Sequence, residues 1–290
     1  MEFEDYLRRK GLSSRTIKSY SNGLNFIQQI NQRTNLELYD YTYSDVMGFV
    51  KLRQRMGVGI RTINGELNTL RKYFNYLILE GLKGDNPAVG VIVKGAKKNT
   101  LYNLISQKKL EDIYKNQTYD LPKYCRNKVI LGLLIYQGLS VEELKRVNTF
   151  NIDIEEGILT VPEGAKSNGR TITLLSKQLM PIVQYLGYKR QQLNPEKAER
   201  LNQLIISEGS DDKITASLAT IKRNLKKQHP EFQSWLQLRA SVISQRVNLS
   251  NLRQMQYYFG FKYIDSIERY LEQSVDDLRE ELDNYFNLFF

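Results

Sequence analysis

The sequence predicts a mainly α-helical chain of two bodies, the second of which also holds a small β-hairpin. Apolar residues recur at helical spacing through residues 3–80 and again through most of residues 104–270. Alternating β-branched residues are confined to residues 158–174, which is typical of one short hairpin. Between the two bodies, Pro87 keeps Asn86 out of the helical conformation and marks where the first body ends.

These signals divide the 290 residues into four parts. We expect a helical domain, a linker, a second domain of mixed α+β structure and an acidic C-terminal helix, over residues 1–84, 85–103, 104–270 and 271–290 respectively. Two domains of ordinary size fit this length. A content of 41% hydrophobic and 26% charged residues is typical of a globular protein with sizeable cores.

The first domain is expected to be a bundle of four helices. Helix one begins at Phe3, and the polar pair Ser13-Ser14 starts helix two. Helix three begins at Ser44, and helix four runs from Arg61 to Glu80, where Gly81 stops it. The apolar residues of helix four fall on one face, as a bundle requires: Ile63, Leu67, Leu70, Phe74, Leu77 and Ile78.

The second domain begins with residues at helical spacing and then changes to the alternating pattern of β-strands. Ser106 is placed to cap one helix, and residues 126–137 form an apolar helix that we assign to the core. Residues 158–162 and 170–174 then predict two short strands around the polar turn 163–169.

Composition excludes several classes of protein. Cys125 is the only cysteine and His229, expected in a loop beside Pro230, is the only histidine, so disulfides, Cys/His metal sites and catalysis based on several such residues are unsupported. We therefore expect no metal and no cofactor. No apolar run approaches the roughly 18 residues of a membrane span, and the N-terminus lacks the features of a signal peptide, so a cytoplasmic protein is expected.

Charge is distributed unevenly along the chain. Residues 1–98 carry a net +7, residues 99–264 a net +9 and residues 265–290 a net −6, within a total of +10. Two basic bodies suit a polyanionic partner such as duplex DNA; the alternative is a solvated basic surface that only aids solubility.

Three phrases of the sequence resemble the lambda-integrase/Xer family of tyrosine recombinases. Residues 12–20 are similar to the phrase that opens one helix of the family's SAM-like core-binding domain, and residues 67–77 to the phrase that lies in its last helix. Residues 256–270 are similar to the nucleophile segment, in which a Leu-Gly-His-like turn, here Phe-Gly-Phe, precedes a tyrosine by a fixed offset. The resemblance covers roughly residues 3–278 and implies a core-binding domain followed by a recombinase catalytic domain.

The resemblance implies three retained catalytic residues. Tyr270 falls on the nucleophile, Arg239 on the second arginine that clamps the scissile phosphate, and Lys166 on the hairpin lysine that protonates the leaving 5′ hydroxyl. Tyr270 and Lys166 have ordinary alternatives, since the chain has 19 tyrosines and exposed hairpin turns often hold lysine.

Other family positions are substituted. Gly138-Leu139-Ser140 places serine where the first clamping arginine is expected, and Leu236 and Phe261 replace two histidines. Serine brings one neutral hydrogen bond and no fork of donors, so we expect a degenerate active site. Arg246 and Lys262 are nearby cations that can compensate.

The expected function is therefore DNA binding with site-specific recombination or integration of a mobile element, weakened in catalysis. One alternative is an inactive pseudo-recombinase that organises DNA, working beside an active recombinase; another is a helical protein-interaction module. Five basic residues are expected to contact DNA: Lys94, Lys97, Lys98, Arg61 and Arg71. The acidic C-terminal helix is expected to join protomers into an oligomer on DNA, or to pack on its own domain, and DNA binding implies association with the nucleoid.

Overall fold

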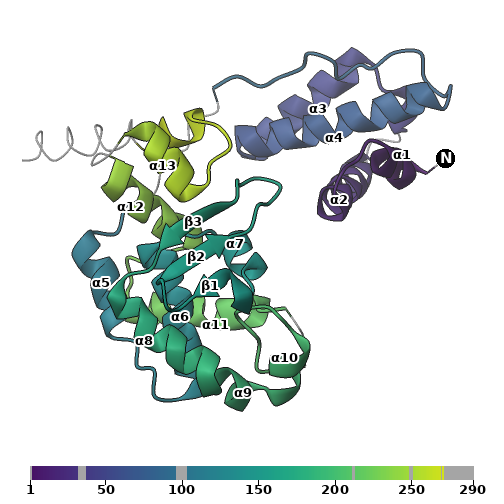
Figure 1. The fold of residues 1–290 in the computed structure, drawn as a ribbon. Helices are drawn as coiled ribbons and strands as arrows, with labels where there is room; N and C mark the ends of the chain where they lie inside the picture. Colours follow the sequence, from purple (N-terminus) through teal and green to yellow (C-terminus); the bar gives the residue numbers. More distant parts are fainter. Residues whose placement is uncertain are drawn as a thin grey trace, which may run out of the picture. The chain divides into compact units, whose positions relative to one another are not determined.

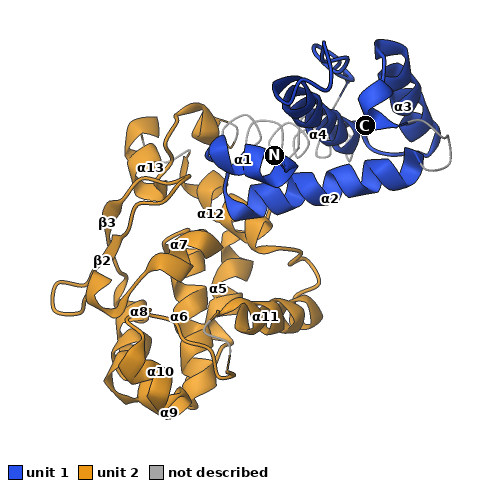
Figure 2. Ribbon diagram, turned by 90° about the vertical axis from the view of Figure 1, so that its right-hand side faces the viewer, with its two compact units in different colours: residues 1–99 blue, residues 100–290 orange. Residues whose placement is uncertain are grey.

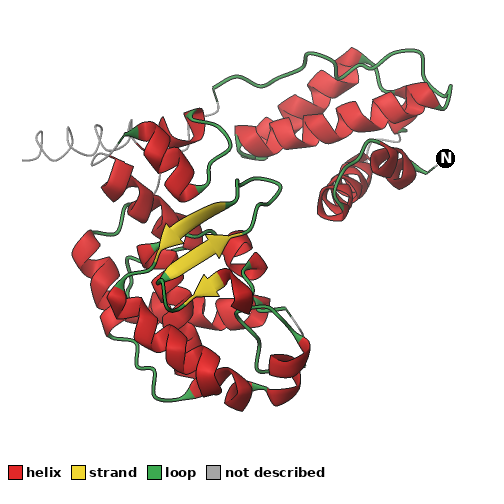
Figure 3. Ribbon diagram, in the orientation of Figure 1, coloured by secondary structure: helices red, strands yellow, loops and turns green. Residues whose placement is uncertain are grey.

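The computed structural model describes residues 2–31, 37–95, 103–210, 213–247, 251–268 and 270. The chain forms two compact units, residues 1–99 and residues 100–290 (Figure 2). Helices dominate both units, and the described residues of the second unit include one small sheet (Figure 3). This confirms the predicted mainly helical class with a mixed second body. The predicted C-terminal helix over 271–290 lies outside the described residues.

The first unit is the predicted helical bundle (Figure 1). Thr42 caps one helix through a capping box with Asp45, which satisfies backbone donors at that end. The elements of the first unit are α1 (Phe3–Arg9), α2 (Ser14–Asn31), the 3₁₀ turn η1 (Leu38–Asp40), α3 (Tyr43–Arg55) and α4 (Ile60–Leu79). The apolar face of α4 forms the centre of the core, where Ile63, Leu67, Leu70 and Phe74 are fully buried.

The chain after α4 folds back onto that helix. Asn64 binds the backbone of Val93 twice, through its Nδ2 to the carbonyl and through its Oδ1 to the N–H, both at 2.9 Å. Ala88 and Val91 are buried in the core of the first unit. The compact unit therefore extends beyond residue 84.

The second unit is built around α6 (Pro122–Tyr136), in which every residue from Cys125 to Tyr136 is buried. Pro122 occupies the first turn of this helix, so the helix begins four residues before the predicted start at Arg126. The other helical elements of the second unit are α5 (Gln107–Lys115), α7 (Val141–Arg146), η2 (Thr149–Asn151), α8 (Ser176–Gln184), η3 (Tyr185–Lys189), α9 (Arg190–Leu193), α10 (Pro195–Arg200), α11 (Thr215–Gln228), α12 (Trp235–Val247) and α13 (Leu252–Phe259).

The sheet has the order β1-β2-β3 with antiparallel pairing (Figure 1). Its strands are β1 (Ile152–Asp153), β2 (Ile158–Val161) and β3 (Arg170–Thr173), so the predicted hairpin is confirmed and β1 is an addition. Leu159 pairs with Ile172, and both side chains are buried, while the next pair, Thr160 and Thr171, is exposed. This alternation fixes the register of the hairpin against the core.

His229 directly follows α11, as expected of a loop residue beside Pro230. None of the helices in the described ranges combines the length and apolar character that a membrane span requires.

Candidate functional site

Ser140 begins α7 as its N-cap residue. Its hydroxyl lies 2.8 Å from Oε2 of Glu143, its own N–H donates to the same oxygen at 2.7 Å, and its hydroxyl accepts from the N–H of Glu143 at 3.2 Å. This is a complete capping box, a common way of satisfying the free donors of a helix start. Ser140, which stands where the resemblance expects an arginine, therefore serves as the cap of α7.

Glu143 is the centre of a buried charge cluster. The residue is 1% exposed, and its two carboxylate oxygens each meet an arginine: Oε1 lies 2.5 Å from Nη1 of Arg170, and Oε2 lies 2.5 Å from Nη1 of Arg239. Burial alone would raise the pKa of Glu143, but the positive charges of Arg239 and Arg170 outweigh it and lower the pKa to about 2. The carboxylate is thus charged at neutral pH and binds β3 to α12.

The same two arginines also hold the turn that ends α13. Arg170 Nε donates to the Tyr258 carbonyl at 2.6 Å, and Arg239 Nη2 donates to the Phe259 carbonyl at 2.9 Å. Gly260 follows in the left-handed conformation with φ of +68°, and a Cβ there would lie 2.2 Å from Nη1 of Arg170. Only glycine fits this backbone beside the guanidinium without a shift.

Phe261 joins two of the predicted catalytic residues. The centre of its ring lies 5.4 Å from the Arg239 guanidinium carbon and 5.9 Å from the centre of the Tyr270 ring. Tyr270 is 8% exposed and belongs to the core of the second unit. The structure thus brings Arg239, Phe261 and Tyr270 into one cluster, with an aromatic ring where the resemblance expects a histidine.

Lys166 lies in the β2–β3 turn, and its side chain is exposed. Gly164 and Ser167 exchange backbone hydrogen bonds of 2.9 and 3.3 Å across this turn. Ser167 also forms a β-bridge with Phe261, and the N–H of Asn168 donates to the Gly260 carbonyl at 3.0 Å. The turn with Lys166 is therefore fixed to the segment that precedes Tyr270.

Leu236 lies in the first turn of α12 with 57% of its surface exposed, whereas Ala240, next to Arg239, is buried. Leu236, which stands where the family has a histidine, therefore lies outside the buried cluster of Glu143, Arg170 and Arg239.

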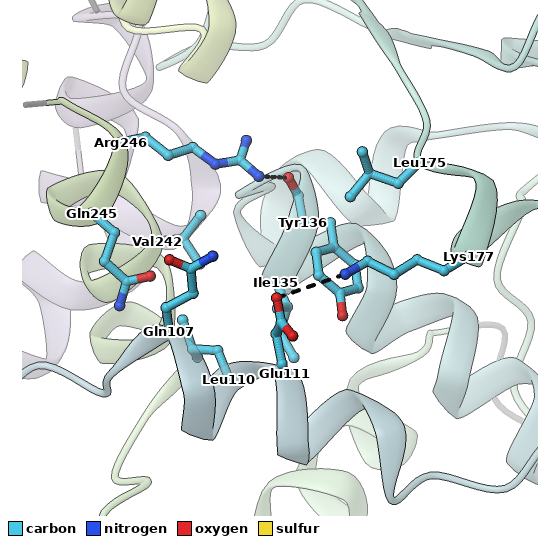
Figure 4. A pocket seen from close by; sticks show the side chains of 10 residues that line it. All are labelled: Gln107, Leu110, Glu111, Ile135, Tyr136, Leu175, Lys177, Val242, Gln245 and Arg246. Atoms are coloured by element: carbon cyan, nitrogen blue, oxygen red, sulfur yellow. Dashed lines mark hydrogen bonds and ion pairs between the residues drawn. The ribbon is translucent and has the colours of Figure 1, made fainter. Parts of the chain in front are cut away.

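The two candidate compensating cations have other contacts. Lys262 Nζ lies 3.4 Å from Oε1 of Glu163 in the hairpin turn. Arg246 donates to the Tyr136 carbonyl at 2.6 Å and to the Tyr258 hydroxyl at 2.7 Å. Arg246 lines a pocket of about 270 Å³, and Figure 4 shows it among the side chains of the pocket wall. On its opposite side Lys177 lies 3.9 Å from the centre of the Tyr136 ring.

Of the five basic residues assigned to DNA contact, three lie in the described part of the first unit. Lys94 and Arg61 are exposed. Arg71 donates to the carbonyls of Ala88 and Val91 at 3.1 and 3.2 Å, so it holds the returning chain against α4. Lys97 and Lys98 lie outside the described residues.

Glu143 and Arg170 belong to the site but were not among the residues that the sequence predicted for it. A signal for Arg170 was present, because a strand that alternates inward and outward places Arg170 on the same inward face as Ile172. A charged residue at such a position needs a buried partner.

Two family models match the chain. One, described as "Phage integrase, N-terminal SAM-like domain", covers residues 1–81, and the other, described as "Phage integrase family", covers residues 103–276.

Curated relatives include proteins named tyrosine recombinase XerD. The protein from Haemophilus influenzae is 25% identical over 186 residues, covering 64% of this chain and 62% of the relative. The protein from Proteus mirabilis is 28% identical over 190 residues, covering 66% and 60%. The chain thus spans about three fifths of the length of the curated relatives it matches.

Solved structures with the same fold include two complexes with DNA. The Tn1549 transposon integrase with a circular intermediate DNA has a TM-score of 0.67 at 15% identity, over 96% of this chain and 97% of the other. The XerH site-specific recombinase bound to its difH substrate has a TM-score of 0.70 at 14% identity, over 94% and 83%. At these identities, the likeness shows the fold.

Proposed function

The chain belongs to the phage integrase family of tyrosine recombinases, and on that premise we propose that it binds duplex DNA and performs site-specific recombination with a weakened catalytic site. The observation that supports this most is the single cluster of Tyr270, Phe261 and Arg239, with the Lys166 turn bonded to the same segment. Ser167 and Phe261, which lie 94 positions apart in the sequence, meet there.

The proposed reaction is a transesterification. The Tyr270 hydroxyl oxygen attacks a DNA phosphorus and forms a 3′-phosphotyrosyl ester, while its proton passes to solvent and the bond from phosphorus to the 5′ oxygen breaks. The Lys166 ammonium gives its proton to the leaving 5′ oxygen. Attack by a 5′ hydroxyl of another strand on the phosphotyrosyl ester reverses these steps and rejoins the DNA.

The weakness of the site has a physical cause in three positions. Ser140 is neutral and occupied by its capping box, Leu236 is exposed and apolar, and Phe261 covers Arg239 with a ring that lacks a donor. Each preorganised donor to a developing negative charge is worth about 10²–10³ in rate. We therefore propose cleavage that is much slower than a full set of donors would support.

DNA binding is proposed from charge. The two bodies carry net charges of +7 and +9, and Lys94 and Arg61 expose cationic side chains on the first unit. Titration of a short duplex with the protein at increasing salt tests this proposal directly. A mobile element as the source of the DNA, and an association with the nucleoid in the cytoplasm, are the settings we propose for this activity.

Oligomer formation is proposed from the sequence of the acidic segment 271–290. Its apolar residues recur at steps of four, three, four and four, which gives a helix one apolar face that is costly to expose: Leu271, Val275, Leu278, Leu282 and Phe286. Docking on a neighbouring protomer covers this face. Removal of residues 279–290 should abolish higher-order DNA complexes and preserve single-site binding. Loss of folded protein would instead show that the segment packs on its own domain.

A second candidate function is an architectural DNA-binding factor without cleavage, acting beside an active recombinase. The observation that favours it is the complete engagement of Ser140 and the covering of Arg239, which leave the phosphate position with few donors.

Trapping on a nicked suicide substrate separates the two candidates. A nick close to the cleavage site lets the short 5′ fragment diffuse away, so a slow enzyme accumulates as a covalent adduct. An adduct that forms in the native protein and disappears in Tyr270→Phe, with DNA affinity retained, supports recombination. No adduct in the native protein, with salt-sensitive DNA binding, supports the architectural role. If Tyr270→Phe still forms the adduct, then Tyr257, Tyr258 or Tyr263 is the nucleophile.

A further inference from the structure

Arg146 is a cation that the catalytic scheme above does not use. It is the last residue of α7, six positions after Ser140 on the same short helix. Its guanidinium lies directly against the β2–β3 turn, because a Cβ added to Gly164 would be 2.4 Å from both the Cζ and Nη2 of Arg146. Glycine at this position is what allows the guanidinium to reach the turn.

The contact of Arg146 falls beside Lys166. Its Nη2 donates to the Ser167 hydroxyl at 2.8 Å. Ser167 is 8% exposed, and its backbone both closes the turn with Gly164 and forms the bridge with Phe261. Arg146 therefore binds a residue of the turn, next to Lys166, that is itself paired with the segment leading to Tyr270.

The Nε of Arg146 is buried and makes no hydrogen bond within the described residues. A buried donor without a partner costs roughly 1–3 kcal/mol, so this arginine is a poor choice for stability alone. Lys145, its neighbour, differs in this respect, because it forms an ion pair with Glu142 at 3.0 Å, one turn back on α7.

We infer that Arg146 is a positioning residue that fixes the β2–β3 turn and thereby aims Lys166 at the leaving 5′ oxygen. The inference rests on the proposed function, in which Lys166 supplies the proton for that oxygen. In this role Arg146 acts on the reaction by holding the turn that carries Lys166, and it does not contact the phosphate.

The test compares two leaving groups. One nicked substrate carries the ordinary 5′ oxygen at the scissile phosphate, and the other carries a bridging 5′ sulfur, which leaves as a thiolate without needing a proton. General acid catalysis contributes about 10²–10⁴ in rate, so Lys166→Ala should slow adduct formation on oxygen by about that factor. Arg146→Met, which keeps length and removes the guanidinium, should slow it at least about tenfold, since misplacement alone is costly.

On the sulfur substrate both variants should return to within about twofold of the native rate, because the step that Lys166 assists is no longer required. Lys145→Met is the matched control and should behave as the native protein on both substrates. A defect of Arg146→Met that persists on sulfur, or no defect on oxygen, overturns the inference.

Amide hydrogen exchange on the free protein tests the same inference without DNA. The N–H groups of Gly164 and Ser167 should exchange at least about tenfold faster in Arg146→Met and be unchanged in Lys145→Met, since local opening of the turn limits their exchange. If the native protein cleaves neither substrate, the proposed function fails, and this measurement alone decides whether Arg146 fixes the turn. Unchanged exchange of the Gly164 and Ser167 N–H groups in Arg146→Met overturns the inference that Arg146 fixes the turn.

Discussion

The guanidinium of Arg239 lies 5.4 Å from the centre of the Phe261 ring, in the geometry of a cation–π contact. The same guanidinium is bonded to the Glu143 carboxylate and to the Phe259 carbonyl. An arginine held on three sides keeps a fixed position, but few of its donors remain for a phosphate. Phe261 therefore helps to fix the position of Arg239 and at the same time limits its use in catalysis. Substitutions of Phe261 should separate these two effects.

Replacing Phe261 with histidine should raise adduct formation on a nicked substrate. The imidazole supplies a hydrogen-bond donor where charge develops, an effect on the order of 10²-fold for a well-placed donor. Phe261→Leu is the control, because it removes the aromatic contact with Arg239 and adds no donor. An equal gain in both variants would show that uncovering Arg239, and not the added donor, limits the reaction.

Ser140→Arg combined with Leu236→His should also raise cleavage if the site has simply lost its donors. The substitution at residue 140 removes the helix cap, which costs about 1 kcal/mol, so stability should fall as activity rises. Ser140→Ala measures the loss of the cap without the added charge. An unchanged cleavage rate in a folded double variant that still binds DNA would favour the architectural function.

Neutralising Glu143 should destabilise the second unit strongly. Glu143→Gln leaves Arg170 and Arg239 without their shared carboxylate, and breaking a buried ion pair in this way costs about 3–5 kcal/mol. Glu142→Gln, at the exposed neighbouring position, should change the free energy of unfolding by less than about 1 kcal/mol.

The effect of Glu143→Gln should depend on pH in a defined direction. The pKa of Glu143 is lowered on folding from an ordinary 4.5 to about 2, so its charged form stabilises the native state fully above pH 4.5. That contribution is lost as pH falls from 4.5 through 2. Urea unfolding should therefore show a difference between native and Glu143→Gln proteins that shrinks over this interval. A constant difference would contradict the assigned charge of Glu143.

Local sequence patterns predict the helices of this chain well and its long-range contacts poorly. The apolar stripe of α4 predicted its bounds within one residue, because helix packing repeats along the chain. Ser140 was assigned only to a family arginine position, and its capping box with Glu143 depends on local geometry that this assignment obscured. Arg170 and Glu143 meet across 27 positions of sequence, and no local pattern specifies such a partner.

DNA affinity should fall steeply with salt. Each phosphate that the protein neutralises releases counterions and adds about 0.9 to the slope of log affinity against log salt concentration. Lys94→Ala should reduce this slope by about one if the residue lies on a phosphate. Lys145→Ala, on the second unit, is assigned no DNA contact and serves as the control. Binding that does not change between low and physiological salt would contradict DNA as the polyanionic partner.

Gly260→Ala should disrupt the turn that precedes Tyr270. Any residue with a Cβ pays about 1–2 kcal/mol for the left-handed conformation at this position. In addition, the new Cβ would lie 2.2 Å from Nη1 of Arg170 and 3.0 Å from the Asn168 carbonyl oxygen. Overpacking of this kind typically adds about 1–3 kcal/mol.

Gly157→Ala separates these two costs. Gly157 has a φ of +63° in the same unit, and a Cβ there would meet only Leu179 at ordinary contact distances of 3.9 and 4.0 Å. Its loss in unfolding free energy measures the backbone cost alone, and Gly260→Ala should exceed it. Because Arg170 must move to admit the Cβ, adduct formation through Tyr270 should also fall in Gly260→Ala and not in Gly157→Ala. Equal losses in both variants would show that the Arg170 guanidinium yields freely and does not hold the turn.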